Sequence, residues 1–155
     1  MLELVKNGCT VLLDKGFGSD EIGRANRLVG QVKAQGWPVM ELDAASVLSA
    51  VMGEHLRCRM LTWQGGIGEF SALVGESDEY IGYDSAGQHI AAALGVPTLD
   101  IFSRNASAVF RERWQPTGPN LASVVAECAA GGTPRAATDI LAEVMTLHKE
   151  ILAKR

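Results

Sequence analysis

Short β-rich runs alternate with longer helical runs along the chain, and this alternation constrains the fold more than any other feature. The runs that predict strands lie at residues 10–13, 38–42, 59–63, 79–83, 97–102 and 122–126. Segments typical of helices occupy residues 19–35, 43–56, 67–74 and 87–94, and a last helix is expected over 136–153. Parallel neighbouring strands need crossover connections, so this order predicts a mostly parallel sheet with helices on both faces.

We therefore expect an α/β fold: a single Rossmann-like, doubly wound domain over residues 1–155, with a mostly parallel sheet of about six strands. A chain of 155 residues is long enough to bury a substantial core. No internal repeat, low-complexity tract or linker divides it.

The composition excludes several classes of protein. Hydrophobic residues make up 47% and charged residues 21% of the chain, as in ordinary globular domains. The net charge of −4 argues against a nucleic-acid-binding surface. No apolar run is long enough to span a membrane, and the N-terminal MLELVKNGCT lacks the regions of a signal peptide, so a cytoplasmic location is expected. Cys9, Cys58 and Cys128 form no CxxC pair, which predicts reduced thiols.

Three loops that follow expected strands are candidate ligand sites: DKGFG at 14–18, WQGGIGE at 63–69 and YDSAGQH at 83–89. Ligands of parallel α/β sheets bind outside the carboxyl ends of the strands. Each loop leads into a helix, whose free N–H groups and positive end favour an anion such as a diphosphate. None of the loops matches a Walker A or GxGxxG sequence, so the glycines alone are weak evidence.

The loop at 83–89 is the richest in polar residues. Asp84 or Ser85 can cap the helix, Gly87 leaves its first turn open, and His89 falls within that turn. A purely structural interpretation also fits, because Asp and Ser are common helix caps and His89 can be a half-buried imidazole. A serine-hydrolase interpretation is disfavoured, since Ser85 is not in a GxSxG elbow.

The segment DSAGQHIAAALGVPTLDIFS, residues 84–103, resembles the D-[ST]-G-x-x-H-[LI]-A-A-A-x-G-x-P motif of heptosyltransferase-like glycosyltransferases (family 9). The preceding GGIGEFSALVGESDEYIGYDS is similar to the family's loop and helix ahead of this motif. RWQPTGPN followed by VVAEC resembles its downstream W-x-P turn and cysteine-bearing strand. The resemblance covers roughly residues 11–128 and is specific over about 63–103.

The resemblance implies the C-terminal half of a GT-B fold, which holds the nucleoside diphosphate of the donor sugar without a metal or other cofactor. Asp84 and Ser85 match the motif's acid and hydroxyl, and His89 matches its histidine. The neighbouring loop that lines the nucleotide is matched by residues 64–66. The substrate-binding residues implied in this way are Gln64, Gly65, Gly66, Asp84, Ser85, Ala86, Gly87, Gln88 and His89.

The sequence departs from the family in two respects. Ala86 stands where the family has glycine, with Gly87 one position later. The half that binds the acceptor and supplies the catalytic base has no counterpart in these 155 residues, so no catalytic residue is assigned and the chain alone is expected to be inactive. Lys6 and Lys15 are possible stand-ins for the family's basic phosphate-binding residue, and each also fits a plain surface lysine.

Other residues fit both a binding and a structural role. Glu41 ends an expected strand, where a carboxylate can bind ribose hydroxyls. Arginines at 104, 111 and 113 can engage phosphate or form a solvated helix face, and Trp63 and Trp114 can border a base or pack in turns. His55 and His148 have no partner at metal-ligand spacing, so no metal site is expected.

Two functions from different classes follow. The first is the sugar-nucleotide-binding domain of a glycosyltransferase that acts on a glycan or lipopolysaccharide-type acceptor once its other half is supplied. The alternative is a stand-alone, non-catalytic binding or assembly module with a face that favours homo-oligomers. The sequence leaves the base, the sugar and the acceptor open.

Overall fold

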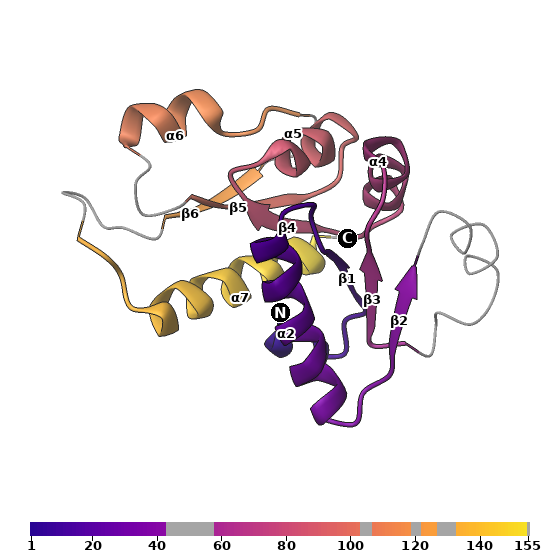
Figure 1. Ribbon diagram of the computed structural model, residues 1–155. Coiled ribbons are helices and arrows are strands. Elements are labelled where there is room, and N and C mark those ends of the chain that lie inside the picture. The colour runs from indigo at the N-terminus through magenta and orange to yellow at the C-terminus, as the bar shows by residue number, and fades with distance from the viewer. Residues whose placement is uncertain (43–57, 103–106, 119–121, 127–132, 155) are drawn as a thin grey trace. The chain divides into compact units, whose positions relative to one another are not determined.

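The computed structural model describes residues 1–42, 58–102, 107–118, 122–126 and 133–154 (Figure 1). The chain forms two compact units, Met1–Phe70 and Ser71–Arg155, each with its own three-stranded parallel sheet. An α/β fold with parallel strands is thereby confirmed. The expected single sheet of about six strands is wrong, because alternating runs identify strands but not which strand edges join through a hydrogen-bond ladder.

Unit 1 consists of α1 (Leu2–Lys6), β1 (Val11–Asp14), α2 (Ser19–Ala34), β2 (Val39–Leu42), β3 (Met60–Trp63) and the start of α4 (Ile67–Gly75). Its strand order is β1-β3-β2, and all pairs are parallel. Asp14, Leu42 and Trp63 lie in one register, so the carboxyl ends of the three strands meet at a single edge. The expected helix at 43–56 lies outside the described residues.

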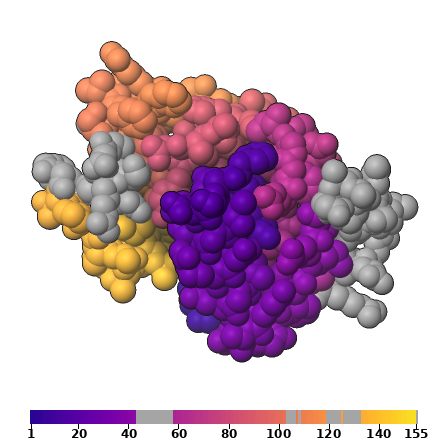
Figure 2. Space-filling view, viewed as in Figure 1, coloured from indigo at the N-terminus to yellow at the C-terminus, as the bar shows by residue number. Residues whose placement is uncertain are grey.

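Helix α2 packs its apolar face on the sheet of unit 1. Its buried residues Ala25, Val29 and Val32 recur at helical spacing. Val29 and Val32 join Val5 and Met60 in one core cluster. The opposite face is charged and exposed, and it forms part of the surface seen in Figure 2. The apolar face therefore fixes α2 on the sheet.

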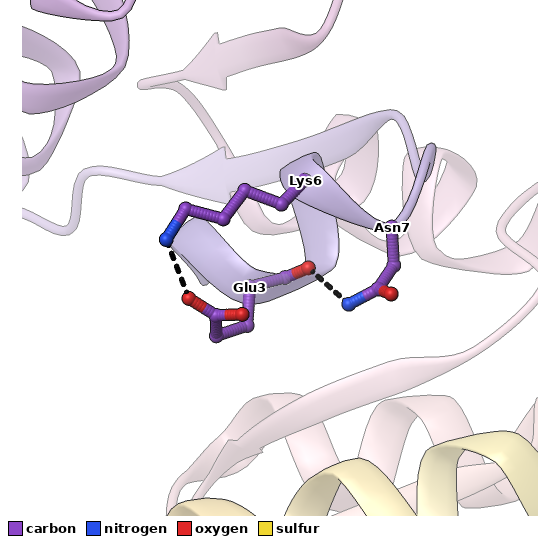
Figure 3. Close-up of polar contacts among 3 residues, drawn as sticks. All are labelled: Glu3, Lys6 and Asn7. Atoms are coloured by element: carbon purple, nitrogen blue, oxygen red, sulfur yellow. Dashed lines mark hydrogen bonds and ion pairs between the residues drawn. The ribbon is translucent and has the colours of Figure 1, made fainter.

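The short helix α1 was not expected from the sequence. Lys6 Nζ lies 2.7 Å from Glu3 Oε1, and Asn7 Nδ2 donates to the Glu3 carbonyl at 2.6 Å (Figure 3). Both contacts are exposed, and such pairs add little stability. Burial of Val5 in the core cluster of unit 1 is therefore the main anchor of this helix.

Unit 2 contains the end of α4, β4 (Tyr80–Tyr83), α5 (Ala86–Ala93), β5 (Thr98–Phe102), α6 (Ala108–Trp114), β6 (Ala122–Ala126) and α7 (Ala137–Ala153). Its strand order is β4-β5-β6, all parallel. Figure 1 shows α5 and α7 on opposite sides of this sheet. None of the described helices combines the length and apolar character needed to cross a bilayer.

The side chains of β5 point alternately toward α5 and toward α7. Leu99 packs with Val125 and Val144 in the core cluster beneath α7, and Ile101 packs against that cluster. Successive strand residues point to opposite faces, so Asp100 lies on the face covered by α5. Gly82 is the register partner of Asp100 on β4 and shares this face. The α5 side of the sheet is therefore partly polar, which is unusual for a buried layer.

Candidate functional site

Unit 1 has a small pocket at the carboxyl ends of its three strands. It has a volume of about 230 Å³ and is lined by Lys15, Glu41, Leu42, Thr62 and Gln64. Lys15 Nζ lies 3.8 Å from Glu41 Oε2, so a cation and a carboxylate face the same space. The volume is below the usual range for drug-sized ligands, so the pocket suits a small polar group.

Thr62 gives this pocket an unsatisfied polar atom. The residue is 1% exposed, and its Oγ1 has no hydrogen-bond partner among the described residues. Buried hydroxyls normally have partners, because leaving one unpaired costs on the order of 1–3 kcal/mol. Together, Lys15, Thr62 and Glu41 offer donors and an acceptor to a hydroxyl-bearing or phosphorylated group. Of the residues implied by the resemblance, only Gln64 lines this pocket.

At Gly65 an aromatic ring leaves no room for a side chain, whereas the nearest atom to Gly66 is the end of the flexible Glu69 side chain. A side-chain carbon on Gly65 would lie 2.6 Å from Cη2 of Trp63, whose ring packs across the glycine. A side-chain carbon on Gly66 would lie 2.6 Å from Oε2 of Glu69. A carboxylate of the protein itself thus lies beside the start of α4, which disfavours an external anion there.

The loop at 14–18 is closed by the protein's own carboxylates. Glu21 Oε2 accepts hydrogen bonds from the backbone N–H of Gly18 at 3.1 Å and of Phe17 at 3.3 Å, and Asp14 Oδ1 accepts from Gly16 at 3.1 Å. These backbone donors, first Gly18 and then Phe17, lower the pKa of Glu21. The anion position predicted at this loop is therefore filled from within, as in a capping box.

The start of α5 differs from both of those helix starts. Ser85 is the N-cap residue, yet its side chain makes no capping hydrogen bond. Ser85 and Ala86 are exposed, and no described residue donates or accepts a hydrogen bond at the Asp84 carboxylate. The first-turn N–H groups of a helix have no partner within it. The Ala86 N–H therefore belongs to an exposed residue and no described side chain caps it, whereas Gly87 and Gln88 are buried.

Gly87 has a packing role at this site. A side-chain carbon there would lie 2.8 Å from Cζ of Tyr80, and one on Gly82 would lie 2.6 Å from the same atom. The Tyr80 ring therefore folds across two glycines, one on β4 and one in the first turn of α5. The family's glycine position is taken by exposed Ala86, so the resemblance does not account for Gly87, whereas the Tyr80 ring does.

Two polar side chains of unit 2 are fully buried, one on β5 and one on α5 itself. Asp100 and Gln88 are both 0% exposed. No described side chain donates a hydrogen bond to the Asp100 carboxyl, and Oε1 of Gln88 has no partner within the described part of the chain. Burial, followed by the nearby charge of Asp84, raises the pKa of Asp100 to about 7, and the Ile101 N–H acts in the opposite direction.

Asp100 was not among the residues predicted from the sequence. The signal was an acid in the middle of the apolar strand PTLDIF, a place where charged residues are rarely buried without a partner. Asp100 and Asp84 lie close enough to interact, so the start of α5 has both donors and a protonatable carboxyl. A protonated Asp100 can donate a hydrogen bond and the Asp84 carboxylate can accept one, so the pair suits a hydroxyl group.

The other residues that were predicted to bind a ligand or to serve structure lie on several elements of unit 2 or outside the described residues. His89 lies in the first turns of α5, its ring centroid 5.9 Å from that of Trp114. Arg111 and Arg113 lie on α6, whereas Arg104 and His55 fall outside the described residues. His148 pairs with Glu79 in the interior of unit 2. Across the described residues no three His, Cys, Asp or Glu side chains gather as a metal ion requires.

Comparison with known proteins adds no relative. No protein-family model matches the chain, and neither a curated protein nor a solved structure matches it.

Proposed function

We propose that the chain binds the diphosphate of a nucleoside diphosphate sugar at the start of α5. In this proposal it is the donor-nucleotide half, of GT-B type, of a glycosyltransferase resembling the heptosyltransferases, and sugar transfer requires an acceptor-binding half. The single observation that carries the proposal is the uncapped start of α5 together with the buried Asp100, whose carboxyl has no side-chain partner among the described residues. Backbone donors at a helix start favour phosphate oxygens.

Asp100 supports the proposal through its protonation. An ionised Asp100 would add to the repulsion that the Asp84 carboxylate exerts on a diphosphate, whereas a protonated Asp100 carboxyl donates a hydrogen bond to a phosphate oxygen. With a pKa raised to about 7, Asp100 is protonated at slightly acidic pH. The buried acid and the backbone donors then act together on one anion.

The pocket of unit 1 supports the same class of ligand independently. Glu41 can accept hydrogen bonds from ribose or sugar hydroxyls, and Lys15 can pair with a phosphate. The pocket is proposed as a subsite in its own right. The experiment below shows whether one ligand perturbs both places.

The test is an amide NMR titration of the full chain with ADP, GDP and UDP. We expect shifts at residues 84–89, and at residues 15, 41, 62 and 64 if the pocket takes part. Absence of shifts at 84–89 with every nucleotide overturns the proposal. Inorganic pyrophosphate serves as the probe for the helix start alone.

A proline substitution tests the backbone donors directly. Ala86 is the first helical residue after an extended Ser85, a position where proline is tolerated. Ala86→Pro removes one N–H, and we expect a roughly 10-fold or greater loss of pyrophosphate affinity, as for a lost charge-assisted hydrogen bond. Ala137→Pro at the start of α7, which follows extended Ala136, is the matched control and leaves the affinity unchanged.

An assembly module is the second candidate. Phe17 is 76% exposed and Ile67 is 63% exposed, and they follow the paired strands β1 and β3 of unit 1. Large apolar side chains exposed near one sheet edge favour self-association. Light scattering tests this candidate: a stable dimer that ignores nucleotides and dissociates in Phe17→Ser/Ile67→Ser supports it, and a monomer excludes it.

A further inference from the structure

Two cysteines of unit 1 lie just before neighbouring strands. Cys9 is two residues before β1, and Cys58 is two residues before β3. The two strands pair in parallel with Val11 opposite Met60, and the Val11 N–H donates to the Arg59 carbonyl at 3.1 Å. Continuing this register toward the amino ends of the strands sets Cys9 opposite Cys58. Both residues are present as thiols.

Hydrogen bonds on either side of Cys9 hold the two segments together. The Thr10 hydroxyl donates to the Cys58 carbonyl at 3.2 Å. Nη1 of Arg59 donates to the Gly8 carbonyl, also at 3.2 Å. The residues on both sides of Cys9 are therefore bonded to Cys58 or to its neighbour, and the two cysteines lie beside each other.

The placement of the two cysteines suits a disulfide. Neighbouring strands lie about 4.8 Å apart, and the Cα atoms of a disulfide are roughly 4.4–6.8 Å apart. Cys58 is buried, whereas Cys9 is partly exposed. A small oxidant therefore reaches Cys9 more readily, and Cys58 lies beside the oxidised product. An accessible thiol next to a second thiol is typical of redox-sensing cysteines.

We propose that Cys9 and Cys58 are a peroxide-responsive thiol pair that forms a disulfide across the starts of β1 and β3. The Cys9 sulfur attacks one oxygen of hydrogen peroxide, the O–O bond breaks, and Cys9 sulfenic acid and one water result. The Cys58 sulfur then attacks the Cys9 sulfur, the S–S bond forms, and the sulfenic hydroxyl leaves with the Cys58 proton as a second water. The two thiols are thereby oxidised, and the peroxide is reduced to water. Because the crosslink closes a long stretch of chain, it should stabilise unit 1.

The experiment treats the full chain with hydrogen peroxide, blocks the remaining thiols and maps the cysteines by mass spectrometry without reductant. Cleavage after lysine and arginine places Cys9 on residues 7–15, Cys58 on residues 58–59 and Cys128 on residues 114–135. We expect each chain to lose the mass of two hydrogen atoms and to yield a peptide that joins residues 7–15 to residues 58–59. Dithiothreitol should reverse both changes. A bond to Cys128, a bond between two chains, or oxidation of Cys9 without a bond overturns the proposal.

Cys128→Ser is the matched control and should form the same linked peptide, whereas Cys9→Ser and Cys58→Ser should not form it. The oxidised natural chain should also unfold at a higher urea concentration than the reduced chain when the unit 1 amide signals are followed. Cys9→Ser should show no such shift. A linked peptide with an unchanged urea midpoint overturns the stabilising role of the crosslink. The peptide map of the natural chain decides whether the disulfide forms, even if a serine variant unfolds.

Discussion

Nδ1 of His148, on α7, lies 2.5 Å from Oε2 of Glu79, the residue directly before β4. The two side chains are 7% and 6% exposed, so the pair links α7 to the sheet in the interior of unit 2. Burial raises the pKa of Glu79, and the hydrogen bond from His148 opposes that shift. Burying the two side chains therefore costs desolvation free energy, which their hydrogen bond offsets.

Removing one partner of this pair should destabilise unit 2 strongly. His148→Leu leaves the Glu79 carboxyl buried without its partner, and we expect a loss on the order of 3 kcal/mol in urea unfolding followed by unit 2 amide signals. Glu79→Leu/His148→Leu should recover much of that loss. Lys6→Ala, which removes the exposed pair with Glu3, is the control and should cost less than about 1 kcal/mol. Equal losses in His148→Leu and the double variant would contradict this prediction.

Asp100 makes stability depend on pH. Its pKa is about 7 in the folded protein and ordinarily 3.8, so the folded state retains a proton that the unfolded chain releases. The stabilisation of the folded state by this group is therefore complete below about pH 3.8, and it is lost as the pH rises through about 7. Asp100→Asn should therefore be more stable than the natural chain at pH 8.5, by roughly 2–4 kcal/mol, and similar to it at low pH.

Urea unfolding at several pH values measures this difference. Asp84→Asn is an informative companion, because it removes the neighbouring charge and leaves the burial of Asp100 unchanged. In Asp84→Asn, the loss of unfolding free energy with rising pH should occur at lower pH, and it should still be present. Parallel pH profiles for the natural chain and Asp100→Asn would show that Asp100 does not titrate in this range.

The sequence predicted the strands well because their apolar runs are short and bounded by glycine, proline and helix caps. Each of the six expected strands is present, with ends shifted by at most one residue. The bounds of helix α6 were not predicted, although a solvated helix face was considered for Arg111 and Arg113, because the helix has only seven residues and little apolar periodicity. The pairing of strands into two sheets follows from long-range contacts that periodicity does not contain.

The candidate site was predictable only in part. The motif residues 84–89 indicated the start of α5, and the glycine loops indicated strand ends. Individual side chains decide which loop is capped. Glu21 caps the loop at 14–18, and Glu69 lies beside Gly66 in the loop at 63–69. No described side chain caps the helix that follows the loop at 83–89. The role of Asp100 depends on its burial and on its proximity to Asp84, which are properties of the folded chain.

Glu21 should be the group that excludes anions from the loop at 14–18. Glu21→Ala frees the N–H groups of Phe17 and Gly18, so sulfate should shift their amide signals in the variant and not in the natural chain. The variant should also melt at a lower temperature, because α2 loses its cap. The lowered pKa of Glu21 means that this capping is lost as the pH falls through that pKa. Sulfate shifts in the natural chain would contradict the assignment.

Gly87 on α5 and Gly30 on α2 should respond in opposite ways to substitution by alanine. Gly87→Ala places a methyl group against the Tyr80 ring, and we expect a loss of about 1–3 kcal/mol because a well-packed contact is overfilled. Gly30→Ala, on α2, meets nothing within 4 Å and should gain about 0.5–1 kcal/mol, since alanine orders a helix at lower entropic cost. Thermal and urea unfolding of both variants measure these opposite signs. If Gly87→Ala is stabilising as well, the Tyr80 ring does not occupy the space beside Gly87, and that residue returns to the set of candidates for close approach by a phosphate.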